Sequence, residues 1–269
     1  MINILQTEFF RLKKNTLFWT LLGVCALLPL VSVLINVLVV WLMGTTDLGV
    51  EVNAWEYMKS FDLTVLALSD LPRPAGHMLF AVICTSVFLC KEFSNGTFRN
   101  MLLANRSRRD VYLSFFIVSV IIGASYLGAS YVFTLIFNGA IFGFGTMSAA
   151  KVVAACVVSL AMALISVIFV QSMMCMFMFS TRKLAVALAC PLVITMLAPS
   201  LIMSFVDVFA QFGLLTTTDM SWIPLYNLTM LDLTQMDGAL IGKILLYIVP
   251  LTVLFAFLGW VSFRKADLK

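Results

Sequence analysis

The residues most able to do chemistry lie in one stretch, Lys91–Asp110, which separates two long apolar segments. Its basic side chains are Lys91, Arg99, Arg106, Arg108 and Arg109. Charge at this density is too costly in hydrocarbon, so we expect the stretch to lie outside a bilayer, on the cytoplasmic face according to the positive-inside rule. Arginines in such a loop pair with acidic side chains of a partner or with lipid phosphates.

The middle of this stretch has the pattern of a short amphipathic helix. Residues 94–97, Ser-Asn-Gly-Thr, are typical of a turn and a helix start, and Phe98, Met101 and Leu102 follow at i, i+3, i+4 spacing. An apolar helix face that points at the cytosol needs a surface that buries it. We therefore interpret the helix as a docking element; the alternative is a helix that rests on lipid headgroups.

Other residue types that commonly carry chemistry are scattered along the chain. The six cysteines all fall in apolar runs without a C-x-x-C pair, and His77, the only histidine, has no partner ligand nearby in the sequence. This pattern favours buried thiols over a metal or redox centre. No G-x-x-x-x-G-K-[ST] motif is present. We therefore expect no cofactor and no enzymatic activity in this chain.

Polar residues inside the apolar segments are the remaining candidates. Gln171 must find a hydrogen-bond partner away from lipid, so it either lines a translocation path or bonds a neighbouring helix, and Asn36 is a second candidate for such a path. Every Asp and Glu lies in a loop or at the end of an apolar segment, which argues against a proton- or sodium-coupled carrier. The repeated small residues of 123–131 favour close packing of helices.

The composition places these residues in a polytopic helical membrane protein. Of the 269 residues, 62% are hydrophobic and 11% are charged, whereas a soluble domain carries about 25% charged residues. Apolar runs long enough to cross a bilayer recur along the chain. The predicted architecture is all-α, a single transmembrane domain over residues 1–269 with six spans: 17–43, 75–90, 111–144, 152–180, 184–206 and 244–263.

The distribution of charge orients this layout. Of the 17 lysines and arginines, 13 fall in segments predicted to be inside and four outside, whereas nine of the 13 acidic residues fall outside. Both chain ends are therefore expected in the cytoplasm, and the net charge of +4 reflects this asymmetry and not nucleic-acid binding. Residues 1–14 are predicted to form an interfacial helix on the inner surface, and residues 207–242 a helical hairpin half-sunk in the outer leaflet.

The central loop resembles that of the type-2 ABC exporter permeases. In that family an acidic residue closes the second span, a Gly-Thr pair opens a coupling helix, and a Ser-Arg pair leads into the third span. The resemblance also implies an interfacial helix before the first span and a re-entrant helix pair between the last two. It assigns coupling to an ATPase to nine residues of this loop: Glu92, Gly96, Thr97, Phe98, Met101, Leu102, Arg106, Ser107 and Arg108.

The resemblance implies an assembly of two permease halves, identical or homologous, with two ABC ATPase subunits in a bacterial plasma membrane. Phe98, Met101 and Leu102 are expected to seat in a groove on the ATPase, with Arg106 and Arg108 pairing with its acids or with lipid phosphates. Small outer loops and few polar groups in the spans favour export of a hydrophobic or amphipathic cargo: a peptide, a drug or a lipid. The alternative is a non-transporting membrane anchor or sensor subunit whose basic inner loop binds a different cytosolic partner.

Overall fold

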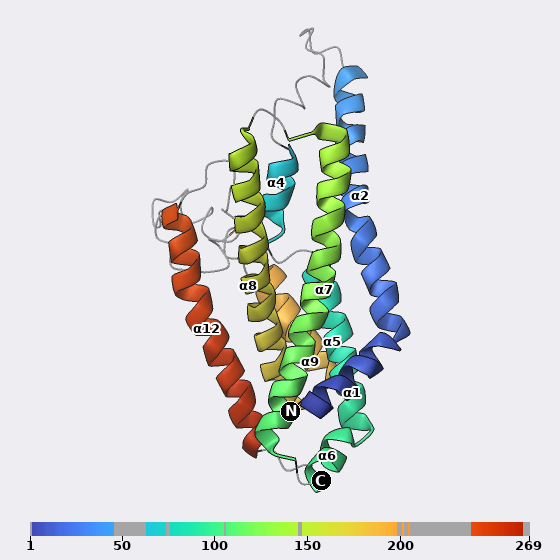
Figure 1. Ribbon diagram of the computed structural model, residues 1–269, viewed down its shortest axis with the longest axis vertical. Coiled ribbons are helices and arrows are strands. Elements are labelled where there is room, and N and C mark those ends of the chain that lie inside the picture. Colours follow the sequence, from blue (N-terminus) through green and yellow to red (C-terminus); the bar gives the residue numbers. More distant parts are fainter. Residues whose placement is uncertain are drawn as a thin grey trace.

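The computed structural model describes residues 2–45, 63–73, 76–104, 106–144, 147–197 and 238–265, with residues 201 and 204. Every regular element over these ranges is a helix, as the sequence predicts (Figure 1). In chain order the helices are α1 (Ile2–Lys13), α2 (Thr16–Thr45), α4 (Leu63–Asp70), α5 (Gly76–Ser94), α6 (Thr97–Leu103), α7 (Arg108–Phe142), α8 (Ala149–Thr181), α9 (Leu184–Leu192) with a π-helical turn η1 (Val193–Leu197), and α12 (Gly238–Lys265).

Five of these helices, α2, α5, α7, α8 and α12, are long and apolar enough to cross a membrane. They correspond to five of the six predicted spans. The last span is longer than predicted, because residues 238–242, assigned to the outer hairpin from the sequence, form the first turn of α12. The rest of that hairpin lies outside the described residues. The segment predicted as the fifth span is described only as the shorter apolar helix Leu184–Leu197.

This shorter helix changes its hydrogen bonding at Pro191. Proline has no N–H, so it leaves the carbonyl of Ala187, four residues earlier, without its helical partner. The hydroxyl of Ser86 on α5 donates to that carbonyl at 3.4 Å, and the wider π-helical turn follows directly. A polar side chain of a neighbouring helix thus satisfies a backbone group that lipid could not.

The central helix of the described bundle is α7, which packs against α1, α2, α4, α5, α8 and α12. Three of its tyrosines donate hydrogen bonds to backbone carbonyls of neighbouring helices. Tyr112 reaches α12 at 2.6 Å, Tyr126 reaches α2 at 3.2 Å, and Tyr131 reaches α8 at 2.8 Å. Because lipid supplies no competing water, such bonds fix how the helices are rotated against each other.

Close helix packing occurs at the first glycine of the small-residue repeat. A Cβ on Gly123 would lie 2.6 Å from Cγ1 of Val167 on α8, so only glycine fits there. Gly128, five residues later, has open space around it. The repeat therefore brings α7 against α8 at one point, in agreement with the packing interpretation.

Candidate functional site

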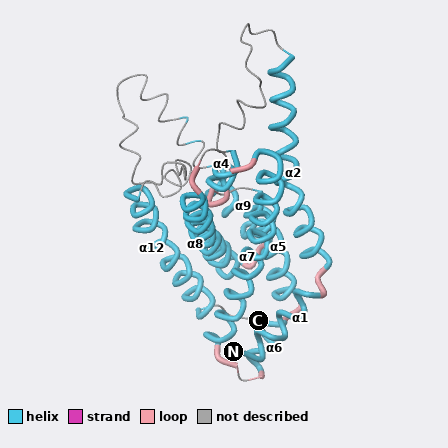
Figure 2. Tube along the Cα trace, turned by 45° about the horizontal axis from the view of Figure 1, so that its top comes forward, coloured by secondary structure: helices cyan, strands magenta, loops and turns pink. Residues whose placement is uncertain are grey.

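The basic stretch singled out from the sequence lies at one end of the bundle. Figures 1 and 2 place α6, α1 and the C-terminal end of α12 together at this end, opposite α4. The connection into α6 turns at Gly96, whose φ of 66° lies in the left-handed region that suits glycine. Beyond α6, Ser107 caps α7 because its hydroxyl accepts a hydrogen bond from the backbone N–H of Asp110 at 3.1 Å. The predicted short helix and the turn that opens it are therefore confirmed.

The apolar face of α6 points into the bundle and not toward a partner. Phe98 is only 1% exposed, and its ring centroid lies 4.2 Å from that of Phe93 on α5 and 4.5 Å from that of Phe115 on α7. Phe179 of α8 and Phe263 of α12 complete the cluster, each 5.8 Å from Phe98. The expectation that Phe98 seats in an ATPase groove is thus wrong, because the chain's own aromatic rings already bury it.

The other two residues of that face follow Phe98. Met101 and Leu102 are half-buried and pack against the same core, whereas Leu103 is 74% exposed. The apolar spacing correctly indicated that one face is buried, but that face holds α6 to its own bundle. Any surface that α6 offers to another protein is therefore its polar side, which carries the exposed residues Arg99 and Asn100.

Arg108 also has an intramolecular role. Its guanidinium donates hydrogen bonds to the backbone carbonyls of Phe263 at 3.4 Å and of Arg264 at 2.7 Å, in the last turn of α12. Carbonyls at a helix C-terminus lack helical partners and carry partial negative charge, so a guanidinium there stabilises the helix end. Arg108 thus ties α12 to the start of α7, and the expected pairing of its other N–H donors with acids of a partner or with phosphates stays a prediction.

Several cations at this end do face solvent. The exposed ones on and around α6 are Lys91, Arg99, Arg106, Arg109, Arg182 and Lys183. A hollow of about 420 Å³ lies between the end of α5, α6 and the turn after α8; Phe93 and Phe98 line it together with Arg99 and Arg182. This basic surface, and not the apolar face of α6, is the part of the predicted site that can bind an acidic partner.

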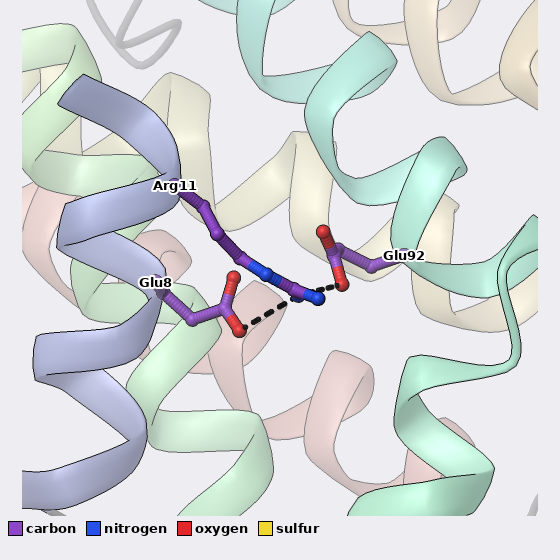
Figure 3. A network of polar contacts seen from close by, with 3 residues as sticks. All are labelled: Glu8, Arg11 and Glu92. Carbon is purple, nitrogen blue, oxygen red and sulfur yellow. Dashed lines mark hydrogen bonds and ion pairs between the residues drawn. The ribbon is translucent and has the colours of Figure 1, made fainter. Parts of the chain in front are cut away.

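A buried ionic network joins α1 to the end of α5 beside α6 (Figure 3). Arg11 contacts Glu92 at 2.6 Å and Glu8 at 3.3 Å, so one guanidinium bridges two carboxylates. The side chains of Glu8 and Glu92 are 0% and 7% exposed, whereas that of Arg11 is 41% exposed. Glu92, expected to act in ATPase coupling, thus holds the interfacial helix to the segment that leads into α6.

Glu8 is the member of this network whose negative charge is least well stabilised. Burial and, to a smaller extent, the nearby Glu92 carboxylate raise the pKa of its carboxyl, Arg11 lowers it, and the net result is a pKa of about 7. The second carboxyl oxygen of Glu8, Oε2, is buried without a hydrogen-bond partner. The sequence analysis missed Glu8 and Arg11 as site residues. Their spacing of three along an amphipathic helix indicated that they could pair with each other. The bond from Arg11 to Glu92, 81 positions later, could not be predicted from the sequence.

Comparison with known families finds a match that covers most of the chain. Residues 4–198 match the sequence profile described as "ABC-2 family transporter protein". The chain belongs to this family. No curated protein and no solved structure matches it significantly. The matched range includes α1, α6 and all residues of the Glu8–Arg11–Glu92 network, so the site described above lies within the ABC-2 region.

The two polar residues considered for a translocation path in this ABC-2 protein do not come together. Gln171 of α8 is buried against α7, where its Nε2 would lie 3.2 Å from a Cβ on Gly123. Asn36 of α2 is half-buried and lies eleven residues beyond Cys25, whose carbonyl accepts from Ser130 of α7. Gln171 therefore lies beside Gly123 of α7, whereas Asn36 lies eleven residues of α2 beyond the position of Ser130. Measured along the axis of α7, the two residues are about 25 Å apart. Gln171 packs between helices, with its Oε1 unpartnered, and the two residues do not form one polar site.

Proposed function

We propose that this ABC-2 family protein is the membrane-spanning permease subunit of an ATP-driven exporter. A separate ATPase supplies the energy, two copies of it act on two permease halves, identical or homologous, and the cargo is hydrophobic or amphipathic. The setting is a bacterial plasma membrane. The chain itself performs no hydrolysis in this proposal, which assigns ATP and Mg²⁺ to the partner.

The single observation that carries the proposal is the way α6 is fixed to the bundle. Phe98 packs against rings from α5, α7, α8 and α12, so a force applied to α6 reaches four long helices at once. Interiors this tightly packed transmit displacement instead of absorbing it. A helix that only rested on headgroups would need no such attachment, which favours a role in mechanical coupling and a rigid-body change between inward- and outward-open states.

The exposed cations around α6 are the surface proposed to receive the ATPase. Charge reversal there tests the contact without disturbing the core, because Arg99 and Arg106 are both exposed. The double variant Arg99→Glu/Arg106→Glu is expected to lose at least 90% of the ATPase that co-purifies with the tagged wild-type chain, while its level in the membrane is unchanged. Complementary charges on two partners speed their association, and after charge reversal the two surfaces would repel each other.

A matched control lies at the other end of the bundle. Lys151 at the start of α8 and Lys243 near the start of α12 are also exposed. The double variant Lys151→Glu/Lys243→Glu is expected to keep the ATPase. Retention of the ATPase by the Arg99/Arg106 variant would refute the contact. If the protein that co-purifies with the wild type lacked ATPase activity, the anchor or sensor function would replace the exporter.

A further inference from the structure

A small open pocket, mostly apolar in its lining but with several polar side chains, lies at the end of the bundle opposite α6. Its volume is about 190 Å³, and it lies between α2, α4, α5 and α7. Its polar lining consists of Ser32, Asp70, His77, Ser130 and Thr134, and its apolar walls include Leu28 and Leu71. The volume corresponds to roughly six water molecules, so it fits one polar head group and not a whole amphiphile.

His77 makes this pocket a built site. The side chain is the chain's only imidazole and is 3% exposed, yet its Nε2 has no hydrogen-bond partner among the residues that the structure describes. A buried polar atom without a partner is costly, and native structures keep few of them. In a protein that crosses a membrane, a polar residue at such a position is a candidate for ligand contact.

Three of the polar side chains that line the pocket can still accept hydrogen bonds. The hydroxyls of Ser32 and Ser130 spend their protons on backbone carbonyls, at 2.8 Å to Pro29 and 3.2 Å to Cys25, so only their lone pairs are left. Asp70 stands at the rim with a side chain that is 62% exposed and an ion pair to Arg73 at 2.6 Å. One arginine contact leaves further acceptor sites on a carboxylate.

We propose that this pocket binds the primary ammonium group of a cationic amphiphile. Three N–H donors of an ammonium match several acceptors at a pocket of this size, and the carboxylate of Asp70 at the entrance favours a positive charge. The alkyl chain leaves along Leu28 and Leu71. The identification of this ligand with cargo rests on the proposed exporter function; the binding itself does not.

Gly76 sets the width of the pocket. A Cβ on this first residue of α5 would lie 2.8 Å from Cδ1 of Leu28, one of the lining side chains. The substitution Gly76→Ala therefore displaces Leu28 and changes the cavity without removing any polar group. It complements Asp70→Asn, which removes the negative charge, and Ser130→Ala, which removes one acceptor.

The sole histidine gives a direct readout. In the full-length protein in lipid nanodiscs, with the imidazole nitrogens labelled with ¹⁵N, His77 provides the only ring signals. Decylammonium is expected to shift the Nε2 resonance until the site is saturated. Decanol, which has the same alkyl chain without the charge, is expected to leave the resonance unchanged. Asp70→Asn is expected to weaken the apparent affinity for decylammonium at least tenfold. Ser130→Ala is expected to weaken it at least threefold. Gly76→Ala is expected to weaken it as well, and Asp110→Asn, at the other end of α7, serves as the control with unchanged affinity.

Three results would overturn the site. These are the absence of a saturable shift with folded protein, an equal shift with decanol, and equal affinity in Asp70→Asn and wild type. Folding of each variant is checked by its unligated ¹⁵N signal and by size-exclusion chromatography, and if Asp70→Asn does not fold, equal affinity in Ser130→Ala and wild type overturns the site instead. If the shift is present but cells with and without the chain resist decylammonium equally, the binding site stands and its assignment to cargo falls.

Discussion

The buried Glu8 carboxyl predicts an unusual dependence of stability on pH. Its pKa of about 7 in the folded protein compares with an ordinary value of 4.5, so folding binds a proton more tightly at this site. A raised pKa contributes stability that is fully present below the unfolded value and is lost as pH rises through the folded one. The difference of roughly 2.5 units corresponds to about 3 kcal/mol, lost between pH 4.5 and 8.

Glu8→Gln isolates this contribution because glutamine resembles the protonated acid. We expect the variant to match the wild type at pH 5 and to be more stable at pH 8 by up to about 3 kcal/mol, which is roughly 5–10 °C in Tm for a chain of this size. Thermal unfolding in detergent micelles between pH 5 and 8.5 measures both quantities. The informative result is that the dependence of Tm on pH becomes weaker in Glu8→Gln than in the wild type. A Tm measured at one pH is less informative because it also responds to changes in packing.

The control for this experiment is Asp110→Asn. Asp110 is a half-exposed carboxylate in the first turn of α7, at the same end of the bundle, and its substitution is expected to leave the slope unchanged. If wild type and Glu8→Gln lose stability equally between pH 5 and 8.5, then Glu8 is not held in the buried, shared position beside Arg11, and the network of Figure 3 does not form as described.

Three further predictions concern packing and capping, and thermal unfolding at pH 7 measures each. Phe98→Ala should cost about 3–5 kcal/mol because it empties the centre of the aromatic cluster, whereas Leu103→Ala, on the exposed side of α6, should change stability by less than about 0.5 kcal/mol. Gly123→Ala should destabilise by about 1–3 kcal/mol, since its Cβ would overlap a valine of α8, while Gly128→Ala, in open space, should be neutral or stabilising. Arg108→Ala should cost about 1–2 kcal/mol through the lost cap on α12; an unchanged Tm would contradict the tie between the two helices.

Local patterns predicted the helices well and their partners poorly. The apolar runs, the turn before α6 and the cap at Ser107 depend on neighbouring residues, so they could be found in the sequence. The spacing of Phe98, Met101 and Leu102 indicated a buried face but not what buries it. The rings that do so, such as Phe179 and Phe263, come from segments far away in the chain, and no periodicity relates them.

The same limit explains the ionic network. A glutamate and an arginine on an amphipathic helix ordinarily face solvent, and nothing near Glu8 in the sequence indicates that its side chain is fully buried. Its environment depends on Glu92, 84 positions later, and on the way α1 lies against the bundle. Charge counting predicted both residues on the inner side of the membrane, but it could not distinguish a solvated charge from a buried one.

These contacts together make the basic end of the molecule a single rigid unit. Arg11 ties α1 to α5, Phe98 ties α6 to four long helices, and Arg108 ties α12 to α7. A partner that moves α6 must therefore move the ends of all these helices or break at least one buried contact, which costs more than tilting the bundle. In the proposed function, coupling through this end depends on two separate features: exposed cations that bind the ATPase, and buried contacts that transmit its motion. If that proposal holds, a variant of either kind uncouples transport, but only the second kind also lowers the stability of the isolated protein.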